Sequence, residues 1–523
     1  MENPIQSSIA GNQIATYKPN LAVEHEDVHV DLTIDRERYK VETSRWRRIR
    51  QHSLTQMLFI SIQAFCGPAL SDAISGLGGG GLATPKTSNI RFALDQGVEA
   101  IVCLFGAVLV NIIGVKWSLV IGAASFPLLG ASYYCNSQFE NQWFLILTAP
   151  FTGIGFGFWN ISEGAYVMSI APEAKRGKYL ALWIVSRNAG KLTLSEKNHV
   201  DDTSLSGQLV GGAINLAKNS TKDAGGGIDP STYIPFIIIE ALALPFAFGI
   251  CEMKDVVRSD GTKILILPKL KNFEELKYIL KTYLSKIIYC SFLFIIWSYF
   301  YNGPWSTYLA LYFSVRSRSL SSLISPFFCI IGCFGLGFIL DLSNKNYSQR
   351  KRAQFGFWLI IFLNLLVYIW SLIIQIDFIR NNPGSIDWND KKFLKSFLPY
   401  FFIQTTGPLA QVYTYWILSS FAESGQDNIR FSAALKAIQC VGNAIAFGVS
   451  AADSFPLTGM ILNCSLMVAC IPGMWYITSK TPDRIPADVI AEEMILERRI
   501  KMEDPGQKDA LDQVHTREVA TLA

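Results

Sequence analysis

The apolar run from residue 143 to residue 170 constrains the fold of this chain more than any other feature. It contains a single charged side chain, Glu163. A helix of this length can cross the hydrocarbon core of a bilayer with some tilt. Lys175, Arg176 and Lys178 follow, and the chain becomes apolar again at Tyr179. The sequence therefore predicts a membrane span that ends at a basic, cytoplasmic edge.

Eleven further apolar segments predict an all-α polytopic membrane protein with about 12 transmembrane helices. Only 17% of the 523 residues are charged, which is few for a soluble chain that must cover its own surface. The net charge is +4, and the basic residues are scattered between apolar segments, which argues against a nucleic-acid partner. The predicted segments are 53–75, 95–113, 117–134, 143–170, 179–216, 232–251, 287–313, 322–341, 354–376, 397–421, 431–450 and 457–478.

The longest internal linker divides these segments into two groups of six. The predicted organisation is a polar tail at 1–52, an amino-terminal half at 53–251, a central loop at 252–286, a carboxy-terminal half at 287–478 and a polar tail at 479–523. Basic residues in alternate loops place both tails in the cytoplasm, with the chain in the plasma membrane or an endomembrane. Within the central loop we expect a surface helix, acting as a brace or as a solvated connector. Asn272 would cap it, and its apolar face would hold Phe273, Leu276, Leu280 and Tyr283.

Residues 191–207 form an anomalous polar insert in the fifth segment. Residues 179–190 would make only about 18 Å of helix, whereas adding 208–217 gives about 33 Å, enough to cross the bilayer. The insert holds six charged or histidine side chains, so it cannot lie in hydrocarbon cheaply. It either loops out to water, lines a cavity, or is a retained intron that is absent from the working protein.

Three charged residues lie deep inside predicted spans and are candidate coupling residues: Glu163, Arg187 and Glu240. Asp72 and Glu99 are expected near the outer ends of their spans, where solvation is easier. Glu163 precedes Lys175 by twelve residues and Arg187 follows it by twelve, so both should lie at similar depth on a helical hairpin. We therefore predict that Glu163 and Arg187 pair, with Glu240 as a competing partner for Arg187.

Glycine-proline pairs interrupt corresponding spans of the two halves. Cys66-Gly67-Pro68 lies in the first span, Asn302-Gly303-Pro304 lies at matching depth in the seventh, and Gly407-Pro408 lies in the tenth. Such breaks are tolerated where neighbours or a cavity satisfy the freed backbone groups. The two six-span halves match the major facilitator layout, in which a substrate binds between the halves. The candidate substrate residues are Asn302, Gly303, Pro304, Trp159 and Tyr301.

No set of residues with catalytic or metal-ligand spacing is present, so the chain is predicted not to be an enzyme and to need no cofactor or metal. The GxGxG at 153–157 and the GGGG at 78–81 lack the strand and helix that a nucleotide loop requires. The spacing of Gly153 and Gly157 favours close helix packing. The GGGG run is interpreted as a flexible or tightly packed turn. Most of the ten cysteines lie in apolar runs and are interpreted as packing residues.

A set of short motifs resembles the fungal branch of the Unc-ninety-three-like family of the major facilitator superfamily. These are LGGGG at 77–81, SEGAY at 162–166, APEAKRGKYLALW at 171–183, RNAG at 187–190, LVGGAINL at 209–216 and VVRSDGT at 256–262. The resemblance covers residues 53–478. It implies the major facilitator fold. It leaves two functions open, because animal relatives include a channel regulatory subunit and a trafficking chaperone, whereas the fold itself implies a solute carrier.

The first hypothesis is a secondary transporter that moves a small solute by alternating access, with protons as the candidate coupling ion. The alternative is a non-transporting regulatory or trafficking partner of another membrane protein, a channel or a receptor. The expected partners are thus the lipid bilayer, a solute and protons, or a second membrane protein. Asn219 heads an NST sequon in an outward loop and is a candidate N-glycosylation site.

Overall fold

The computed structural model describes residues 44–82, 84–170, 207–257, 272–341, 348–421, 425–452 and 455–482. Within these ranges the chain is a bundle of helices, and the only strand-like pairings are two isolated bridges, between His52 and Val257 and between Phe313 and Ile386. Several predictions concern parts of the chain outside the described residues: Arg187, residues 191–206 of the insert, the basic turn at Lys175, and most of both tails. Those predictions stay open.

The first group of helices comes from the amino-terminal part of the chain. It consists of α2 (Arg45–Gln51), α3 (Ser53–Ala64), a π-helical turn (Phe65–Ala69), α4 (Leu70–Ser75), α5 (Pro85–Ile113), α6 (Val115–Phe139), α7 (Gln142–Ile170), α9 (Gly207–Asn219) and α10 (Tyr233–Gly249). The second group consists of α11 (Asn272–Tyr283), α12 (Lys286–Phe300), α13 (Asn302–Tyr312), α14 (Val315–Asp341), α15 (Gln349–Arg380), α16 (Phe393–Ser420), α17 (Gly425–Ala452) and α18 (Pro456–Ser479).

The described helices confirm a polytopic membrane protein. Eight of them, counting α3 to α4 as one, are long and apolar enough to cross a bilayer, and the bent pair formed by α11–α13 makes a ninth. The less apolar α5 and α16 have 29 and 28 residues, which correspond to about 42–44 Å of helix and so also suffice to span. With α9, whose preceding residues are not described, these helices match the twelve predicted segments.

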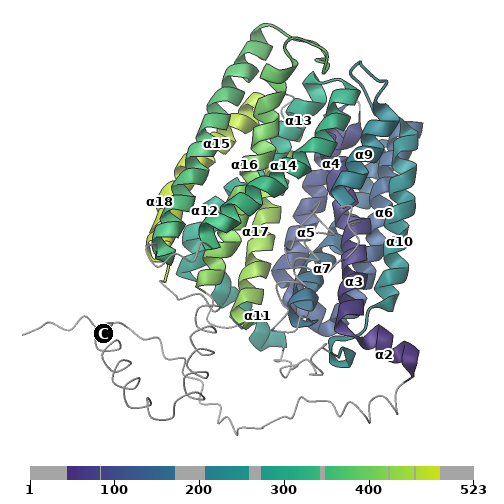
Figure 1. Ribbon diagram of the computed structural model, residues 1–523, viewed down its shortest axis with the longest axis vertical. Coiled ribbons are helices and arrows are strands. Elements are labelled where there is room, and N and C mark those ends of the chain that lie inside the picture. Colours follow the sequence, from purple (N-terminus) through teal and green to yellow (C-terminus); the bar gives the residue numbers. More distant parts are fainter. Residues whose placement is uncertain are drawn as a thin grey trace, which may run out of the picture.

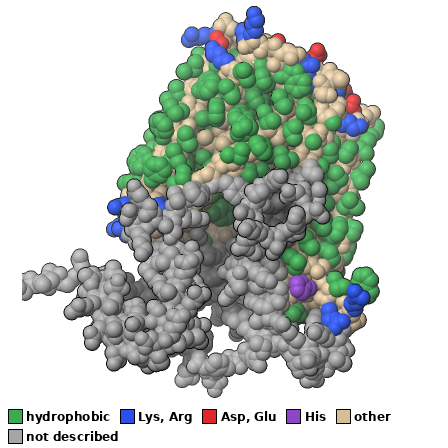
Figure 2. All heavy atoms as spheres, in the orientation of Figure 1, with side chains coloured by type: hydrophobic (Ala, Val, Ile, Leu, Met, Phe, Trp, Pro, Cys, Tyr) green, Lys and Arg blue, Asp and Glu red, His purple; other side chains and the backbone are tan. Residues whose placement is uncertain are grey.

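The two groups lie side by side in the bundle, with α5 packed along α17 and α9 packed along α14 where the groups meet (Figure 1). An apolar band covers the middle of the bundle, and Lys and Arg side chains gather at its two ends (Figure 2). Large apolar side chains of the long helices are exposed, among them Ile101, Phe151, Ile238, Trp358 and Ile373. This is the surface expected of a protein whose solvent at mid-height is lipid.

The predicted helix breaks occur at the expected places but take different forms. Pro68 sits in the π-helical turn between α3 and α4, because proline cannot donate the backbone bond that a regular helix needs. Tyr301 separates α12 from α13, so Asn302-Gly303-Pro304 begins a new helix. Gly407 and Pro408 lie inside the continuous α16, where Gly407 faces the ring of Tyr301.

The predicted surface helix of the central loop is confirmed as α11, Asn272–Tyr283. Its face differs from the prediction, because Leu280 is 51% exposed whereas Ile279 is buried. The helix packs against both α5 and α17, and the Arg430 guanidinium lies 4.8 Å from the ring centre of Tyr278. The contacts with both groups argue against a solvated connector.

Candidate functional site between the two groups of helices

Helix α5 carries three buried charged residues, Arg91, Asp95 and Glu99, which are 0%, 4% and 2% exposed. Their four-residue spacing places them on one face of the helix. The prediction of a span beginning at residue 95, with Glu99 near its outer end, is wrong, because the helix begins at Pro85 and Glu99 lies at its middle. Buried charges are tolerated inside a span when they are paired, so the polar residues before 95 do not end the helix.

Arg91 and Asp95 form a pair that stays within the first group of helices. Their side chains are 3.6 Å apart, and Thr152 of α7 bridges them. The Arg91 Nη2 donates to Thr152 Oγ1 at 2.8 Å, and that hydroxyl donates to Asp95 Oδ1. The Arg91 guanidinium also lies 5.4 Å from the ring centre of Tyr133. The pair therefore ties α5 to α6 and α7, and it does not reach the second group.

Glu99, in contrast, pairs across the two groups. The Nζ of Lys436, on α17, lies 3.6 Å from Glu99 Oε1. The same oxygen accepts a hydrogen bond from Asn160 Nδ2 of α7 at 2.7 Å, and Oε2 accepts one from Gln96 Nε2 at 2.7 Å. Both oxygens of the buried Glu99 carboxylate are thus satisfied, as a buried charge requires, whereas the Lys436 side chain is 22% exposed.

The polar network continues from Gln96 into the second group. Asn443 Nδ2 of α17 donates to Gln96 Oε1 at 3.1 Å, and Asn302 Nδ2 donates to Asn443 Oδ1 at 2.9 Å. Gly303 lets α13 approach α17 closely, because a Cβ at this position would lie 2.5 Å from the Ala446 carbonyl oxygen. We call the set Asn160, Glu99, Gln96, Lys436, Asn443 and Asn302 the interface network. It links α7, α5, α17 and α13.

A second connection between the groups lies where α4 ends. Arg318 of α14 is fully buried, and its guanidinium donates to the carbonyl oxygens of Leu77, Gly78 and Gly226 at 2.7, 2.7 and 2.8 Å, with a longer bond of 3.3 Å to Leu82. Ser306 of α13 adds a bond from the backbone N–H of Gly79. We call this set of bonds the Arg318 latch. It holds the GGGG turn, which is thus a tightly packed turn, against the second group.

The predicted residue Glu240 lies on α10, inside the first group, and is 0% exposed. Within the described part of the chain, neither of its carboxylate oxygens has a hydrogen-bond partner. Ser71 and Gly130 lie beside it, but the Ser71 hydroxyl donates to the Gly67 carbonyl. A carboxylate in such surroundings is costly to keep charged, so Glu240 is suited to taking up a proton.

The other predicted residues are dispersed. Glu163 is 2% exposed on α7, and its predicted partner Arg187 lies outside the described residues, so their pairing stays a prediction. Trp159 and Tyr301 are 0% and 5% exposed and belong to two separate apolar clusters, which makes them packing residues in this conformation. Pro304 packs against Gly459 of α18. The structure brings Asn302 and Gly303 to the interface network and leaves the others elsewhere.

The predicted glycosylation site at Asn219 is incompatible with this structure. Asn219 is fully buried, and its Nδ2, the atom that would carry the glycan, donates to Asn215 O at 2.9 Å and to Thr232 Oγ1 at 3.1 Å. Its Oδ1 accepts from the backbone N–H of Asp229 at 2.9 Å. The sequon therefore supplies a structural asparagine that orders the loop before α10.

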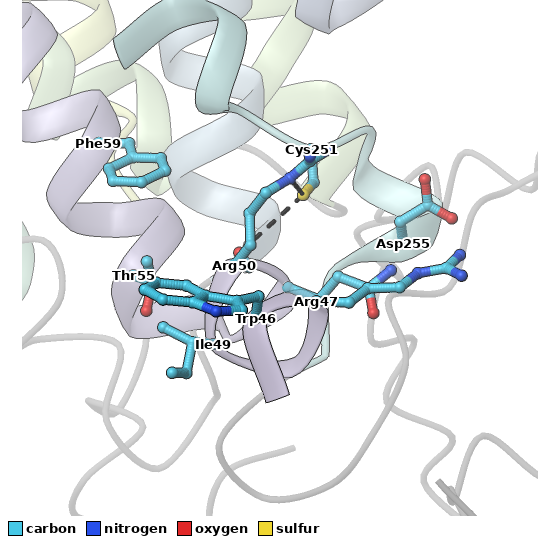
Figure 3. Close-up of a pocket in the computed structure, with 9 residues that line it drawn as sticks. Trp46, Arg47, Ile49, Arg50, Thr55, Phe59, Cys251 and Asp255 are labelled. Atoms are coloured by element: carbon cyan, nitrogen blue, oxygen red, sulfur yellow. Dashed lines mark hydrogen bonds between the residues drawn. The ribbon is translucent and has the colours of Figure 1, made fainter. Parts of the chain in front are cut away.

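A surface cavity of about 630 Å³ lies away from this site, at the end of the bundle next to α2. Figure 3 shows Trp46 and Ile49 on one side and Arg50 reaching towards Cys251, whose sulfur accepts from Arg50 Nε at 3.3 Å. No predicted site residue lines it. The cavity is thus separate from the interface network.

Sequence reasoning missed Lys436, Arg91, Asp95 and Arg318. The four-residue spacing of Arg91, Asp95 and Glu99 after a helix-starting proline was available as a signal. A second available signal was the position of Lys436 within an apolar segment. Arg318 carried no comparable signal, because it precedes the predicted span at 322–341 and only the folded chain shows that it is buried.

Comparison with solved structures defines the class of this fold. A POT family transporter crystallised with 5-aminolevulinic acid superposes with a TM-score of 0.55 at 15% identity, covering 82% of this chain and 96% of the transporter. A D-xylose-proton symporter superposes with a TM-score of 0.53 at 15% identity, covering 83% of this chain and 99% of the symporter. The chain is therefore a multi-pass membrane protein with the major facilitator fold.

Sequence comparison then identifies the family. The notoamide biosynthesis cluster protein O' of Aspergillus versicolor is 33% identical, over 79% of this chain and 86% of the relative. UNC93-like protein 1 of Arabidopsis thaliana is 24% identical, over 83% of this chain and 92% of the relative. The family model described as ion channel regulatory protein UNC-93 matches residues 90–188, which cover most of α5 and all of α6 and α7. The chain belongs to the UNC-93-like family.

Proposed function

We propose that this protein is a secondary transporter that moves a small solute by alternating access with protons as the coupling ion. The observation that carries the proposal is the interface network, in which Glu99 and Lys436 pair across the surface where the two groups of helices meet. Alternating access moves one group against the other around a central site. An ion pair that joins the two groups must therefore break or be neutralised during each cycle.

Protonation of Glu99 supplies a physical means of releasing this contact. The neutral acid no longer attracts the Lys436 ammonium, while Asn160 and Gln96 still offer it hydrogen bonds. Glu99 therefore joins Glu163 and Glu240 as a candidate proton carrier. Arg91 and Asp95 lie within one group, so their pair survives the movement and serves packing.

The Arg318 latch supports the same proposal. It joins the groups at the end of α4, which is the contact that a closed end of the proposed transport path would need. Transport requires the opposite state as well, in which the guanidinium leaves these carbonyl oxygens. The name of the Aspergillus relative refers to a biosynthesis cluster, which favours small organic solutes for the first substrate tests.

The test is solute flux in proteoliposomes under an imposed pH gradient, using a panel of sugars, amino acids and small organic acids. We expect Glu99→Gln and Lys436→Met each to lower proton-driven flux at least tenfold, and Glu99→Gln to abolish its pH dependence. Lys277→Met is the matched control, since Lys277 is an exposed lysine on α11. Proton-driven flux that is unchanged in Glu99→Gln would exclude Glu99 as the carrier.

The family description favours one alternative, a non-transporting regulatory partner of an ion channel or another membrane protein. In that case the interface network would hold the two groups of helices together permanently. Absence of flux across the panel, together with a membrane protein that co-purifies in fixed stoichiometry, would support this function instead. Retention of that complex by Glu99→Gln would then show that the pair serves packing alone.

A further inference from the structure

Two cysteines from different groups of helices meet beside Glu99. Cys103 lies one helical turn after Glu99 on α5, and Cys440 lies one turn after Lys436 on α17. The two sulfur atoms and a Glu99 carboxylate oxygen all lie within 4.8 Å of one another. Each of the three residues is 1–2% exposed, and all ten cysteines of the chain are free thiols. We propose that Glu99, Cys103 and Cys440 bind a thiophilic divalent ion of the zinc class.

The geometry is close to what such an ion needs. Zinc bonds to thiolate sulfur at about 2.3 Å and to carboxylate oxygen at about 2.0–2.2 Å, so tetrahedral ligand atoms stand about 3.5–3.8 Å apart. The three atoms here, which lie within 4.8 Å of one another, therefore need to approach by no more than about 1.3 Å. Two thiolates and a carboxylate select zinc or cadmium over magnesium or calcium, which prefer oxygen ligands.

The charges balance when the ion binds. Two thiolates and the Glu99 carboxylate carry three negative charges, which a divalent ion and the Lys436 ammonium cancel. Without the ion, Lys436 pairs with Glu99. Binding therefore makes Glu99 a ligand while the Lys436 ammonium stays nearby as the third positive charge, and because cysteine binds a metal as thiolate, the apparent affinity rises with pH.

A further side chain borders the site from α11. The Tyr283 hydroxyl is buried and has no hydrogen-bond partner within the described residues, and it lies near both cysteines. It can occupy or cover a fourth coordination position. Of the other ionisable groups nearby, Tyr299 and Tyr415 lie around Lys436. A bound ion would thus join α5 and α17 next to α11, which already packs against both helices.

The ion acts as a clamp between the groups. Because alternating access requires α5 and α17 to move relative to each other, a bound ion should arrest it. This inhibitory consequence rests on the proposed transport function, but ion binding does not. Binding is therefore measured on the purified full-length protein in detergent, and inhibition is measured separately as flux.

The binding experiment titrates cadmium, a spectroscopic substitute for zinc, and follows thiolate-to-metal absorption and the melting temperature. We expect one ion per chain, with higher affinity at higher pH. Cys103→Ser and Cys440→Ser should each weaken binding by at least about 10- to 100-fold, the loss caused even by outer-shell changes at metal sites. The matched control is Cys329→Ser with Cys333→Ser, two cysteines one turn apart on α14 alone.

The possible results test ion binding and solute transport separately. Absorption that persists in the Cys103→Ser, Cys440→Ser double variant, or that vanishes in the α14 control, would overturn the proposed site. Elution of each variant as a single species with the wild-type melting temperature before cadmium addition shows that the fold is intact. Cadmium binding by a protein that shows no solute flux even before cadmium is added would leave the site standing and contradict only the transport function.

Discussion

At the scale of single residues, Asp387 shows how a polar loop side chain positions a spanning helix. It lies between α15 and α16 and accepts hydrogen bonds from Arg316 Nε at 2.6 Å, from Arg316 Nη2 and from Ser314 Oγ at 2.7 Å. Ser314 and Arg316 flank the first residue of α14. The bidentate Arg316 guanidinium holds the pKa of Asp387 well below its usual range, and the Ser314 hydroxyl adds to the effect.

Replacing Asp387 by Asn should lower the free energy of unfolding by about 1–3 kcal/mol at pH 7, because charged hydrogen bonds are lost. The pKa is lower in the folded than in the unfolded state, so the full contribution is present above about pH 4 and is lost as the pH falls towards the folded pKa. Thermal unfolding in detergent should show the difference from wild type narrowing in acid. Asp377→Asn, at an exposed position, is the control. A difference that stays constant with pH would contradict the ionic role.

Asn219 gives a prediction about modification at the same scale. Because its Nδ2 is buried in two hydrogen bonds, protein produced in a glycosylating host should show no mass shift after endoglycosidase treatment. Asn219→Ala should lower the melting temperature, since three hydrogen bonds disappear in a buried site. Glycan found on Asn219 of folded protein would show that the loop before α10 adopts another conformation.

At the scale of elements, the GGGG turn explains how α4 can end against the second group of helices. All four glycines have positive φ, which favours residues without a Cβ. At Gly80 there is also no room, because a Cβ would lie 2.3 Å from Cε1 of Tyr133. The turn therefore depends on glycine for its backbone conformation and for its packing.

Substituting Gly80 by Ala separates these two effects. The left-handed backbone alone costs alanine about 1 kcal/mol, and the clash with Tyr133 should add about 1–3 kcal/mol. Gly384→Ala is the control, because Gly384 has a φ of +67°, close to that of Gly80, but has open space where the Cβ would lie. We expect melting temperatures to fall more for Gly80→Ala than for Gly384→Ala. Equal losses would mean that packing against Tyr133 contributes nothing.

At the scale of the whole molecule, the groups of helices are held together by the Arg318 latch at one end and by the interface network further along α5. Both connections consist of polar contacts between helices that are far apart in sequence. Polar contacts of this kind can be exchanged for water or substrate contacts, whereas a tightly packed apolar interface opens only at a large cost. The proposed transport cycle requires these polar contacts to be released.

Arg318→Met should loosen the latch, because four carbonyl oxygens lose their donor. The measurement is the distance distribution between spin labels at Asp223 and Asn389, two exposed loop positions from different groups. We expect the distribution to broaden towards longer distances. Arg380→Met, at an exposed arginine of α15, should leave it unchanged. An unaltered distribution in Arg318→Met would show that other contacts hold this end closed.

Much of the fold could be predicted from sequence because a bilayer imposes local rules on a chain. Each span needs about 20 mostly apolar residues and must satisfy its own backbone, so composition and length alone reveal the helices, their order and the proline breaks. The spacing of Gly153 and Gly157 likewise predicted the close packing now seen against Asp95 and Val102. The helix α11 was visible from its periodicity.

The candidate site depends on contacts between helices, which local sequence patterns do not predict. Whether Glu99 meets Lys436 or Arg318 meets Gly78 is decided by the rotation and register of helices far apart in the chain. Hydropathy places residue 99 in a span but does not say which neighbour it faces. The sequence by itself determined a membrane protein of the major facilitator type, because burial in lipid acts on each helix separately. Only the tertiary structure decided which charges, amides and thiols meet, because that depends on packing between helices.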